Sequence, residues 1–213
     1  MQPITLEEAA ALYGAADSVH DFDHIRRVLA LAERIATAEG AERVIVRTAA
    51  LLHDWGRAEA DATGRNHAAV AAERAAALLR ERGASPDFIA AVTHAIAAHR
   101  FRTLPEPRTL EAKVLFDADK LDAIGAIGIA RAYAYGGAHR QRLWAPLTEV
   151  EATVGDEAGV TYAEHTPVHE FIGKLARIRE RLTTATGRAI AEERHRFMVA
   201  FFRRLEAEVN GEL

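Results

Sequence analysis

Apolar residues recur at helical spacing along most of the chain, and short stretches rich in glycine, proline or polar residues separate them. His24, Val28, Leu31 and Ile35, for example, follow a 4-3-4 spacing that places all four on one face of a helix. We find no convincing alternation of apolar and polar residues of the kind that is typical of a half-buried strand. The pattern predicts helices over residues 5–14, 18–40, 42–54, 67–82, 86–99, 109–134, 167–184 and 187–209.

Two interruptions are longer than the others. Residues 55–66 contain two glycines and an asparagine and are predicted to form a polar connection. Residues 136–165 are predicted to form a long loop, and long loops in compact domains often act as lids. We therefore expect an all-α protein with one domain over residues 1–213, made of a core at 18–135, a loop or lid at 136–165 and C-terminal helices at 166–210 packed onto the core.

Composition narrows the class of protein. The 213 residues carry a formal net charge of −4, which gives no reason to expect a nucleic-acid polymer or a membrane surface as a partner. The first residues lack the regions of a secretory signal, and no apolar run approaches the ~20 residues of a membrane span. We therefore expect a cytoplasmic protein. Cysteine is absent, so any metal site must use imidazole and carboxylate ligands.

His53 and Asp54 stand side by side at the end of an apolar run, where two polar groups are costly to bury without partners. A cation would stabilise such a pair, and other helices supply further ligands. His24 lies upstream on the apolar stripe, and Asp119 lies downstream. Two imidazoles and two carboxylates suit a divalent ion and leave coordination positions open for water and a substrate oxygen. We interpret the four residues as a metal site.

Each part of this set also has a purely structural interpretation. A buried histidine such as His24 is often a core residue with a backbone partner. His53 could interact with the end of its own helix, with Asp54 as its ion-pair partner. The combination favours the metal site, because four such residues from different helices are harder to explain separately.

Helical periodicity selects Asp119 from a cluster of aspartates. Asp119 shares a helical face with Ala112, Leu115 and Asp122. Asp117 falls on a different face, so we expect it to be exposed to solvent or to support a ligand from behind.

The set resembles the ligands of the HD superfamily of metal-dependent phosphohydrolases, an all-helical family named for the adjacent His-Asp pair. The resemblance extends from about residue 18 to 210, is weakest over 138–160, and points to the stand-alone bacterial branch. Some members of that branch are nucleoside-triphosphate pyrophosphohydrolases. The motifs that carry the resemblance are HDFDH (20–24), AALLHD (49–54), NHA (66–68), HAIAAH (94–99), FDADKLDAIGA (116–126) and TTATGRAIAEER (183–194).

The resemblance implies one divalent ion, with manganese, magnesium, cobalt, nickel and iron not distinguished by the sequence. Its ligands would be His24, His53, Asp54 and Asp119. The resemblance also implies that Asp54 or a nearby carboxylate orients the attacking water. His20 and Asp21 precede His24 closely enough to contact a phosphate or donate a proton, so they join Asp54 as catalytic candidates. Asp21 could instead cap the following helix.

Three further histidines could face this site. Some related two-metal HD proteins have a histidine at the start of the helix after the His-Asp pair, where His67 lies. For His67 we favour contact with a substrate phosphate over a second-metal ligand or an ordinary helix-start residue. His94 and His99 are about 140° apart on a straight helix. Both cannot face one point unless the helix ends or kinks, and we expect His99, nearer the helix end, to face inward.

A polyanionic substrate needs cationic partners. Lys120 follows Asp119, and Lys174 lies in HEFIGKL (169–175), which is similar to a family block of His-Phe-x-Glu-Lys-Leu type. Solvent exposure is the alternative for Lys174. The predicted substrate-binding residues are His67, His99, Lys120, Asp122 and Lys174.

The leading hypothesis is a metal-dependent phosphohydrolase that cleaves a small nucleotide-like phosphate or pyrophosphate ester through a metal-activated water. One alternative is a di-iron HD-type oxygenase, which His67 and His99 would serve. The other is a non-catalytic nucleotide-binding sensor, which the intact set of four ligands disfavours.

Overall fold

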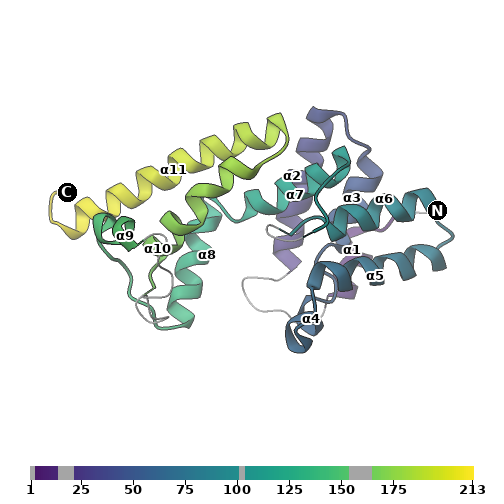
Figure 1. Cartoon of the computed structure of the whole chain (residues 1–213), viewed down its shortest axis with the longest axis horizontal. Coiled ribbons are helices and arrows are strands. Elements are labelled where there is room, and N and C mark those ends of the chain that lie inside the picture. The colour runs from purple at the N-terminus through teal and green to yellow at the C-terminus, as the bar shows by residue number, and fades with distance from the viewer. Residues whose placement is uncertain (1–2, 14–21, 101–103, 154–164) are drawn as a thin grey trace. The chain divides into compact units, whose positions relative to one another are not determined.

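Every regular element in the described part of the chain is helical. The computed structural model describes residues 3–13, 22–100, 104–153 and 165–213, and these ranges contain no strand. Figure 1 shows the helices coloured in chain order. They are α1 (Leu6–Leu12), α2 (Phe22–Glu39), α3 (Arg43–Leu52), α4 (Arg57–Thr63), α5 (His67–Glu81), α6 (Pro86–Ala97), α7 (Leu110–Asp122), α8 (Gly125–Ala138), α9 (Leu147–Thr153), α10 (Pro167–Gly173), the 3-10 helix η1 (Leu175–Arg181) and α11 (Ala185–Val209). The prediction of an all-α protein is confirmed.

The chain forms two compact units. The first comprises Met1–Lys120 together with Thr183–Gly187, and the second comprises Leu121–Leu182 together with Arg188–Leu213. In the first unit, α3 packs against α2 and α6, and α5 packs against α4 and α6. The side chains between these helices are apolar and at most 1% exposed, among them Ile25, Val28, Leu51, Leu52, Val92 and Ile96. Burial of this surface is the main stabilising contribution to the first unit.

Helix ends in the first unit carry three of the candidate histidines. Asn66 caps α5 through its side chain, which places His67 at the first helical position. His53 directly follows α3, and His99 follows the end of α6, a helix that Ser85 caps at its start. The rigid helix holds a side chain at its end in place, but such a side chain need not point in the same direction as the apolar face of the helix. The histidines can therefore gather away from the hydrophobic contacts.

Two predicted connections contain helices that the periodicity did not reveal. α4 occupies residues 57–63, inside the segment predicted to be a polar connection, and α9 occupies residues 147–153, inside the predicted loop over 136–165. Both are seven residues long, which is too short for an amphipathic repeat to be recognised. The predicted polar connection over 55–66 therefore contains a helix that the sequence pattern did not indicate.

Two predicted helices are interrupted. The helix expected over 109–134 is two helices, because Ile124 is extended and Gly125 has a φ of 78°. That left-handed conformation suits glycine and ends α7. The helix expected over 167–184 is α10 followed by η1, with Lys174 in a non-helical conformation between them. In both places, one helix was predicted where the structure has two.

The second unit contains α8, α9, α10, η1 and most of α11. α10 packs against α8, α9 and η1, and Phe171 of α10 stacks on Phe202 of α11 with ring centroids 4.4 Å apart. Residues 154–164 of the predicted lid lie outside the described part of the chain. The expectation of one domain over residues 1–213 stays a prediction.

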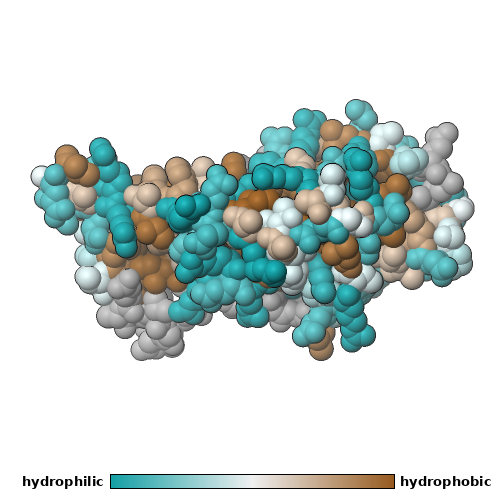
Figure 2. Space-filling model, turned by 90° about the horizontal axis from the view of Figure 1, so that it is seen from above, coloured by the Kyte–Doolittle hydropathy of each residue, from teal (hydrophilic) through white to brown (hydrophobic). Residues whose placement is uncertain are grey.

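The surface is more hydrophilic than the apolar interior of each unit. Hydrophilic residues are spread over the face seen in Figure 2, and hydrophobic ones gather in smaller patches between them. Among the described residues, no helix combines the length and the apolar character needed to cross a membrane.

Candidate metal centre

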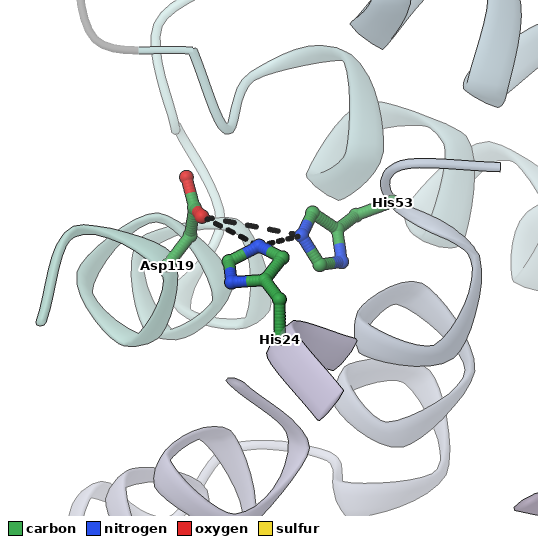
Figure 3. Close-up of side chains that lie close together, drawn as sticks. All are labelled: His24, His53 and Asp119. Carbon is green, nitrogen blue, oxygen red and sulfur yellow. Dashed lines mark hydrogen bonds and ion pairs between the residues drawn. The ribbon is translucent and has the colours of Figure 1, made fainter. Parts of the chain in front are cut away.

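Three side chains from three helices converge in the first unit (Figure 3). His24 comes from the first turn of α2, His53 follows α3, and Asp119 lies near the end of α7. Nε2 of His24 lies 3.3 Å from Nε2 of His53 and 3.4 Å from Oδ1 of Asp119. Nε2 of His53 lies 4.0 Å from the same oxygen. The three ligand atoms face a common point.

Asp54 contacts this group and a second one. Its Oδ2 lies 3.8 Å from Nε2 of His24 and 4.0 Å from Nε2 of His53. Its Oδ1 lies 3.7 Å from Nε2 of His67 and 3.6 Å from Nε2 of His99. Asp54 therefore stands between the ligands that the sequence predicted and a pair of histidines. Asp54, His67 and His99 are themselves close enough together to form a second group of potential metal ligands.

Backbone carbonyls determine where the proton sits on two of these imidazoles. Nδ1 of His53 lies 2.8 Å from the carbonyl oxygen of Ala50, and Nδ1 of His99 lies 2.6 Å from that of Ile96. A carbonyl oxygen only accepts, so Nδ1 donates in both residues, and Nε2 of the neutral ring presents its lone pair to the site. A metal ion binds that lone pair.

The surroundings hold these groups in the protonation states that bind metal. Burial lowers the pKa of His53 to about 4 and that of His67 to about 3, so both rings are neutral at pH 7. Burial alone would raise the pKa of the Asp54 and Asp119 carboxyl groups. His53 beside Asp54, and Lys120 beside Asp119, nevertheless hold both pKa values well below their usual range. Neutral imidazoles and ionised carboxylates are the forms that metals require.

His24, His53 and Asp119 are close enough together to hold a divalent ion, and Asp54 borders them. Two ligand atoms bound at ~2.1 Å to the same ion are about 3 Å apart when they are adjacent. The facing atoms of His24 and His53 lie 3.3 Å apart, and each lies 3.4 to 4.0 Å from a carboxylate oxygen of Asp54 and of Asp119. The Nε2 atom of His53 has no proton to donate, yet it faces a nitrogen and two carboxylate oxygens, an arrangement that a cation would stabilise. Metal ligation by these four residues stays a prediction.

Two cations flank the carboxylates. Nζ of Lys120 lies 2.6 Å from Oδ2 of Asp119, and Nη1 of Arg57 lies 3.0 Å from Oδ2 of Asp54. The Arg57 side chain is 29% exposed, so its guanidinium group can contact both Asp54 and a molecule that approaches from solvent. Our sequence interpretation missed Arg57. Its position three residues after Asp54 could have suggested the ion pair. That spacing brings side chains together only in helical structure, and α4 was not predicted.

Other predicted site residues have different surroundings. Nε2 of His94 accepts a hydrogen bond from the backbone N–H of Arg108, and it is not a member of either group of potential ligands. Asp122 and Lys174 belong to the second unit, where Asp122 pairs with Arg131 and Lys174 pairs with Glu170.

The catalytic candidates His20 and Asp21 lie outside the described residues. Their roles stay predictions, as do the predicted substrate contacts of His67, His99, Lys120, Asp122 and Lys174.

Asp117 requires a correction. Solvent exposure was one of its two expected environments, and that expectation is wrong, because the residue is 0% exposed. Its carboxylate accepts hydrogen bonds from Thr183 and Thr184. Helical periodicity separated Asp117 from Asp119 correctly but could not show that a distant segment covers it.

Comparison with known proteins identifies the family. A model of the HD domain matches residues 21–124. YpgQ of Bacillus subtilis is 36% identical over 198 residues, which is 91% of this chain and 86% of that protein. The chain belongs to the HD-domain family. HD domains bind divalent metal ions, and the His/Asp groups described above could hold one.

Solved structures of HD-domain proteins share the fold. The crystal structure of Bacillus subtilis YpgQ in complex with ADP is 31% identical, with a TM-score of 0.71, and the match covers 95% of this chain and 92% of that one. An HD-superfamily hydrolase from Bacillus thuringiensis is 30% identical, with a TM-score of 0.73 over 96% of this chain and 94% of that one.

A shorter sequence match connects this chain to a ribonuclease. Ribonuclease Y of Chloroflexus aurantiacus is 41% identical over 91 residues, which is 43% of this chain but 16% of that protein.

Proposed function

We propose that this HD-domain protein is a metal-dependent phosphohydrolase that acts on a small nucleotide-like phosphate or pyrophosphate ester. The observation that carries the proposal is the convergence of two imidazoles and two ionised carboxylates, with Arg57 and Lys120 beside the carboxylates. The centre thus combines ligands for a cation with positive charge that could contact the oxygens of a phosphate.

In this proposal His24, His53, Asp54 and Asp119 hold the divalent ion. Such an ion supplies Lewis-acid chemistry, because it lowers the pKa of a water molecule and offsets the negative charge that develops on a phosphoryl group. The bonds from His53 to Ala50 and from Lys120 to Asp119 fix the orientation of two of the ligands.

The other residues of the centre would bind and orient the substrate. The guanidinium group of Arg57 can donate to phosphoryl oxygens in a fixed fork, and Lys120 adds a point charge. His67, with a side chain 12% exposed, would donate Nε2–H to a phosphate oxygen, and His99, whose Nε2 lies 3.3 Å from that atom, would help to orient the ring. Asp54 is placed between the ion and these histidines, where it could accept a proton or orient water.

The nucleotide part of the proposal rests on similarity. YpgQ, which is related along most of its length, has been crystallised with ADP. A nucleoside phosphate is therefore the first class of compound to test.

The decisive experiment combines metal analysis with a panel of substrates. Metal-free protein is loaded with Mn²⁺, Mg²⁺, Co²⁺, Ni²⁺ or Fe²⁺ and incubated with nucleoside mono-, di- and triphosphates, and the products are separated. Pyrophosphate together with a nucleoside monophosphate indicates attack at the α-phosphorus, whereas inorganic phosphate indicates terminal cleavage. The Asp54→Ala variant should lose both activity and metal occupancy. Full occupancy and turnover in Asp54→Ala would show that the His-Asp pair has been misassigned.

A specific observation supports a second candidate function. Asp54, His67 and His99 form an additional ligand group next to the first, and a two-iron centre that activates oxygen would need such a group. This oxygenase alternative predicts two equivalents of iron per chain and oxygen consumption with an organic substrate. The phosphohydrolase predicts release of phosphate or pyrophosphate under anaerobic conditions.

A further inference from the structure

The buried carboxylate of Asp117 receives five hydrogen bonds from two consecutive threonines. Its Oδ1 accepts from the backbone N–H of Thr183 at 2.9 Å and from the Thr183 hydroxyl at 3.1 Å. Its Oδ2 accepts from the Thr183 N–H at 3.2 Å, from the Thr184 N–H at 2.8 Å and from the Thr184 hydroxyl at 2.6 Å. Asp117 has no exposed surface, so these donors replace water completely.

The two threonines that supply these donors directly precede α11. The Thr184 hydroxyl also accepts from the N–H of Gly187, and the N–H of Thr186 donates to Glu39 of α2 at 2.6 Å. A β-carbon at residue 187 would overlap Oδ2 of Asp117, so glycine permits the close approach. The carboxylates of Asp117 and Glu39 therefore hold the first turn of α11 against α7 and α2, and Gly187 leaves room for this contact.

α7 presents Asp117 and Asp119 to opposite sides. Two residues apart on a helix means about 200° of rotation. Asp119 points to His24 and His53, whereas Asp117 points to Thr183 and Thr184. In the part of α7 that belongs to the first unit, the other buried side chains are apolar, and apolar contacts are non-directional. The hydrogen bonds of Asp117 are directional, so they restrict rotation and sliding of the helix about its axis in a way that the apolar contacts cannot.

We infer that Asp117 is a positioning residue for the metal centre, which fixes the rotation of α7, and with it the place of Asp119, by anchoring that helix to Thr183 and Thr184. The inference rests on the proposed function only in that Asp119 is taken to be a metal ligand. Loss of the anchor should reduce metal affinity without removing any ligand.

The test compares Mn²⁺ binding by metal-free, full-length variants, measured by calorimetric titration. Asp117→Asn keeps the shape of the side chain but places an amide NH₂ against donors. Thr184→Val keeps the shape of the threonine but removes its hydroxyl. We expect the Kd for Mn²⁺ to rise by about tenfold to hundredfold in Asp117→Asn, the range seen when residues that orient metal ligands are changed. A smaller increase is expected in Thr184→Val, and Thr184→Ser should restore the wild-type value.

Leu79→Ala is the matched control for a general loss of stability. Leu79 is fully buried in α5 and lies 12 residues after His67, about 18 Å along the helix. Its Kd should equal that of the wild type. The electron paramagnetic resonance spectrum of bound Mn²⁺ gives a second readout, because a displaced Asp119 alters the symmetry around the ion, whereas a destabilised but correctly folded protein keeps the wild-type spectrum.

The outcomes are distinguishable. If the wild type binds Mn²⁺ and both Asp117→Asn and Thr184→Val bind it with the same Kd and spectrum, the positioning role of Asp117 is refuted while the proposed function stands. An equal loss of affinity in Leu79→Ala refutes it too, because stability alone would then explain the effect. If the wild type itself binds no divalent ion, the proposed function fails and this inference fails with it.

Discussion

At the scale of single residues, the chemistry of the centre depends on which charges are buried together. Asp54 and Asp119 are ionised in a mostly buried site, and Arg57 and Lys120 each lie within hydrogen-bond distance of one of them. A divalent ion would therefore enter a site whose carboxylates are already partly balanced. Removing one of these cations should therefore weaken the binding of an anionic substrate but not the binding of a metal ion.

Replacing Arg57 with glutamine should separate these two functions. Substrate binding loses a charge-assisted hydrogen bond worth about 1.5–3 kcal/mol, so KM should rise by about tenfold to hundredfold. Mn²⁺ affinity should hold or increase, because a positive charge beside the ion has been removed. Steady-state kinetics and calorimetry measure the two quantities. Arg65→Gln, which removes an exposed arginine paired with Glu73, is the control and should change neither.

The depressed pKa values of His53 and His67 predict how the stability of the metal-free protein depends on pH. Their folded pKa values are about 4 and about 3, and in the unfolded chain histidine titrates near 6.5. Between these values the unfolded state binds more protons, so the free energy of unfolding should fall as pH decreases from about 7 to 4. Each imidazole contributes a slope of about 1.4 kcal/mol per pH unit.

Chemical denaturation in the presence of a chelator at pH 7, 6 and 5 measures this slope. His67→Gln removes one of the two imidazoles and should reduce the slope in proportion. An unchanged slope in His67→Gln would mean that His67 is protonated in the folded protein.

At the scale of helices, the candidate ligands occupy ends rather than middles. His53 follows α3, His67 begins α5, and His99 follows α6, whereas His94 lies inside α6 and accepts from a backbone N–H instead. The end of α6 is what allows His99 to turn toward Asp54 while His94 does not.

We expect one tightly held divalent ion per chain. A second cation beside the first would be repelled, and the group formed by Asp54, His67 and His99 contains one carboxylate, so little negative charge is available to offset that repulsion. His67→Ala and His99→Ala should therefore slow turnover or weaken substrate binding while one metal per chain remains. His94→Ala is the control and should retain full activity. Elemental analysis decides the question, because two equivalents of iron, with one lost in His67→Ala, would favour the oxygenase.

At the scale of the whole molecule, net charge bears on the size of substrate that we expect. The formal net charge is −4, and the facing atoms of the centre are mostly buried. A nucleic-acid polymer is bound chiefly through cationic surfaces that contact many phosphates. The short match to ribonuclease Y nevertheless makes RNA the polymer to include in any test.

We therefore expect free nucleotides to be hydrolysed and single-stranded RNA to be left intact at the same metal concentration. Activity on nucleotides should also depend weakly on salt, because few phosphates are contacted. Chromatography of nucleotide products and gel analysis of labelled RNA measure the two activities. Degradation of RNA with nucleotides untouched would reverse the assignment of substrate class.

Local patterns were sufficient for several of these features. The spacing of His24 with Val28, Leu31 and Ile35 predicted that this histidine faces the interior, and it is 4% exposed. The adjacency of His53 and Asp54 after an apolar run predicted a buried pair with shared partners. Both predictions depend on neighbours within a few turns of one helix, where sequence spacing and spatial proximity coincide.

Tertiary contacts decided the rest. Asp117 is buried by residues 66 and 67 positions later in the chain, and His67 meets His99 across 32 residues, so no local period could reveal either contact. Arg57 was missed because α4 is too short to show a repeat, and the break at Gly125 depends on one backbone angle. The sequence by itself therefore determined that the protein is helical and which residues could bind a metal. Only the folded chain determined which of them meet, because side chains far apart in sequence are brought together by helix packing and by the helix ends that the packing positions.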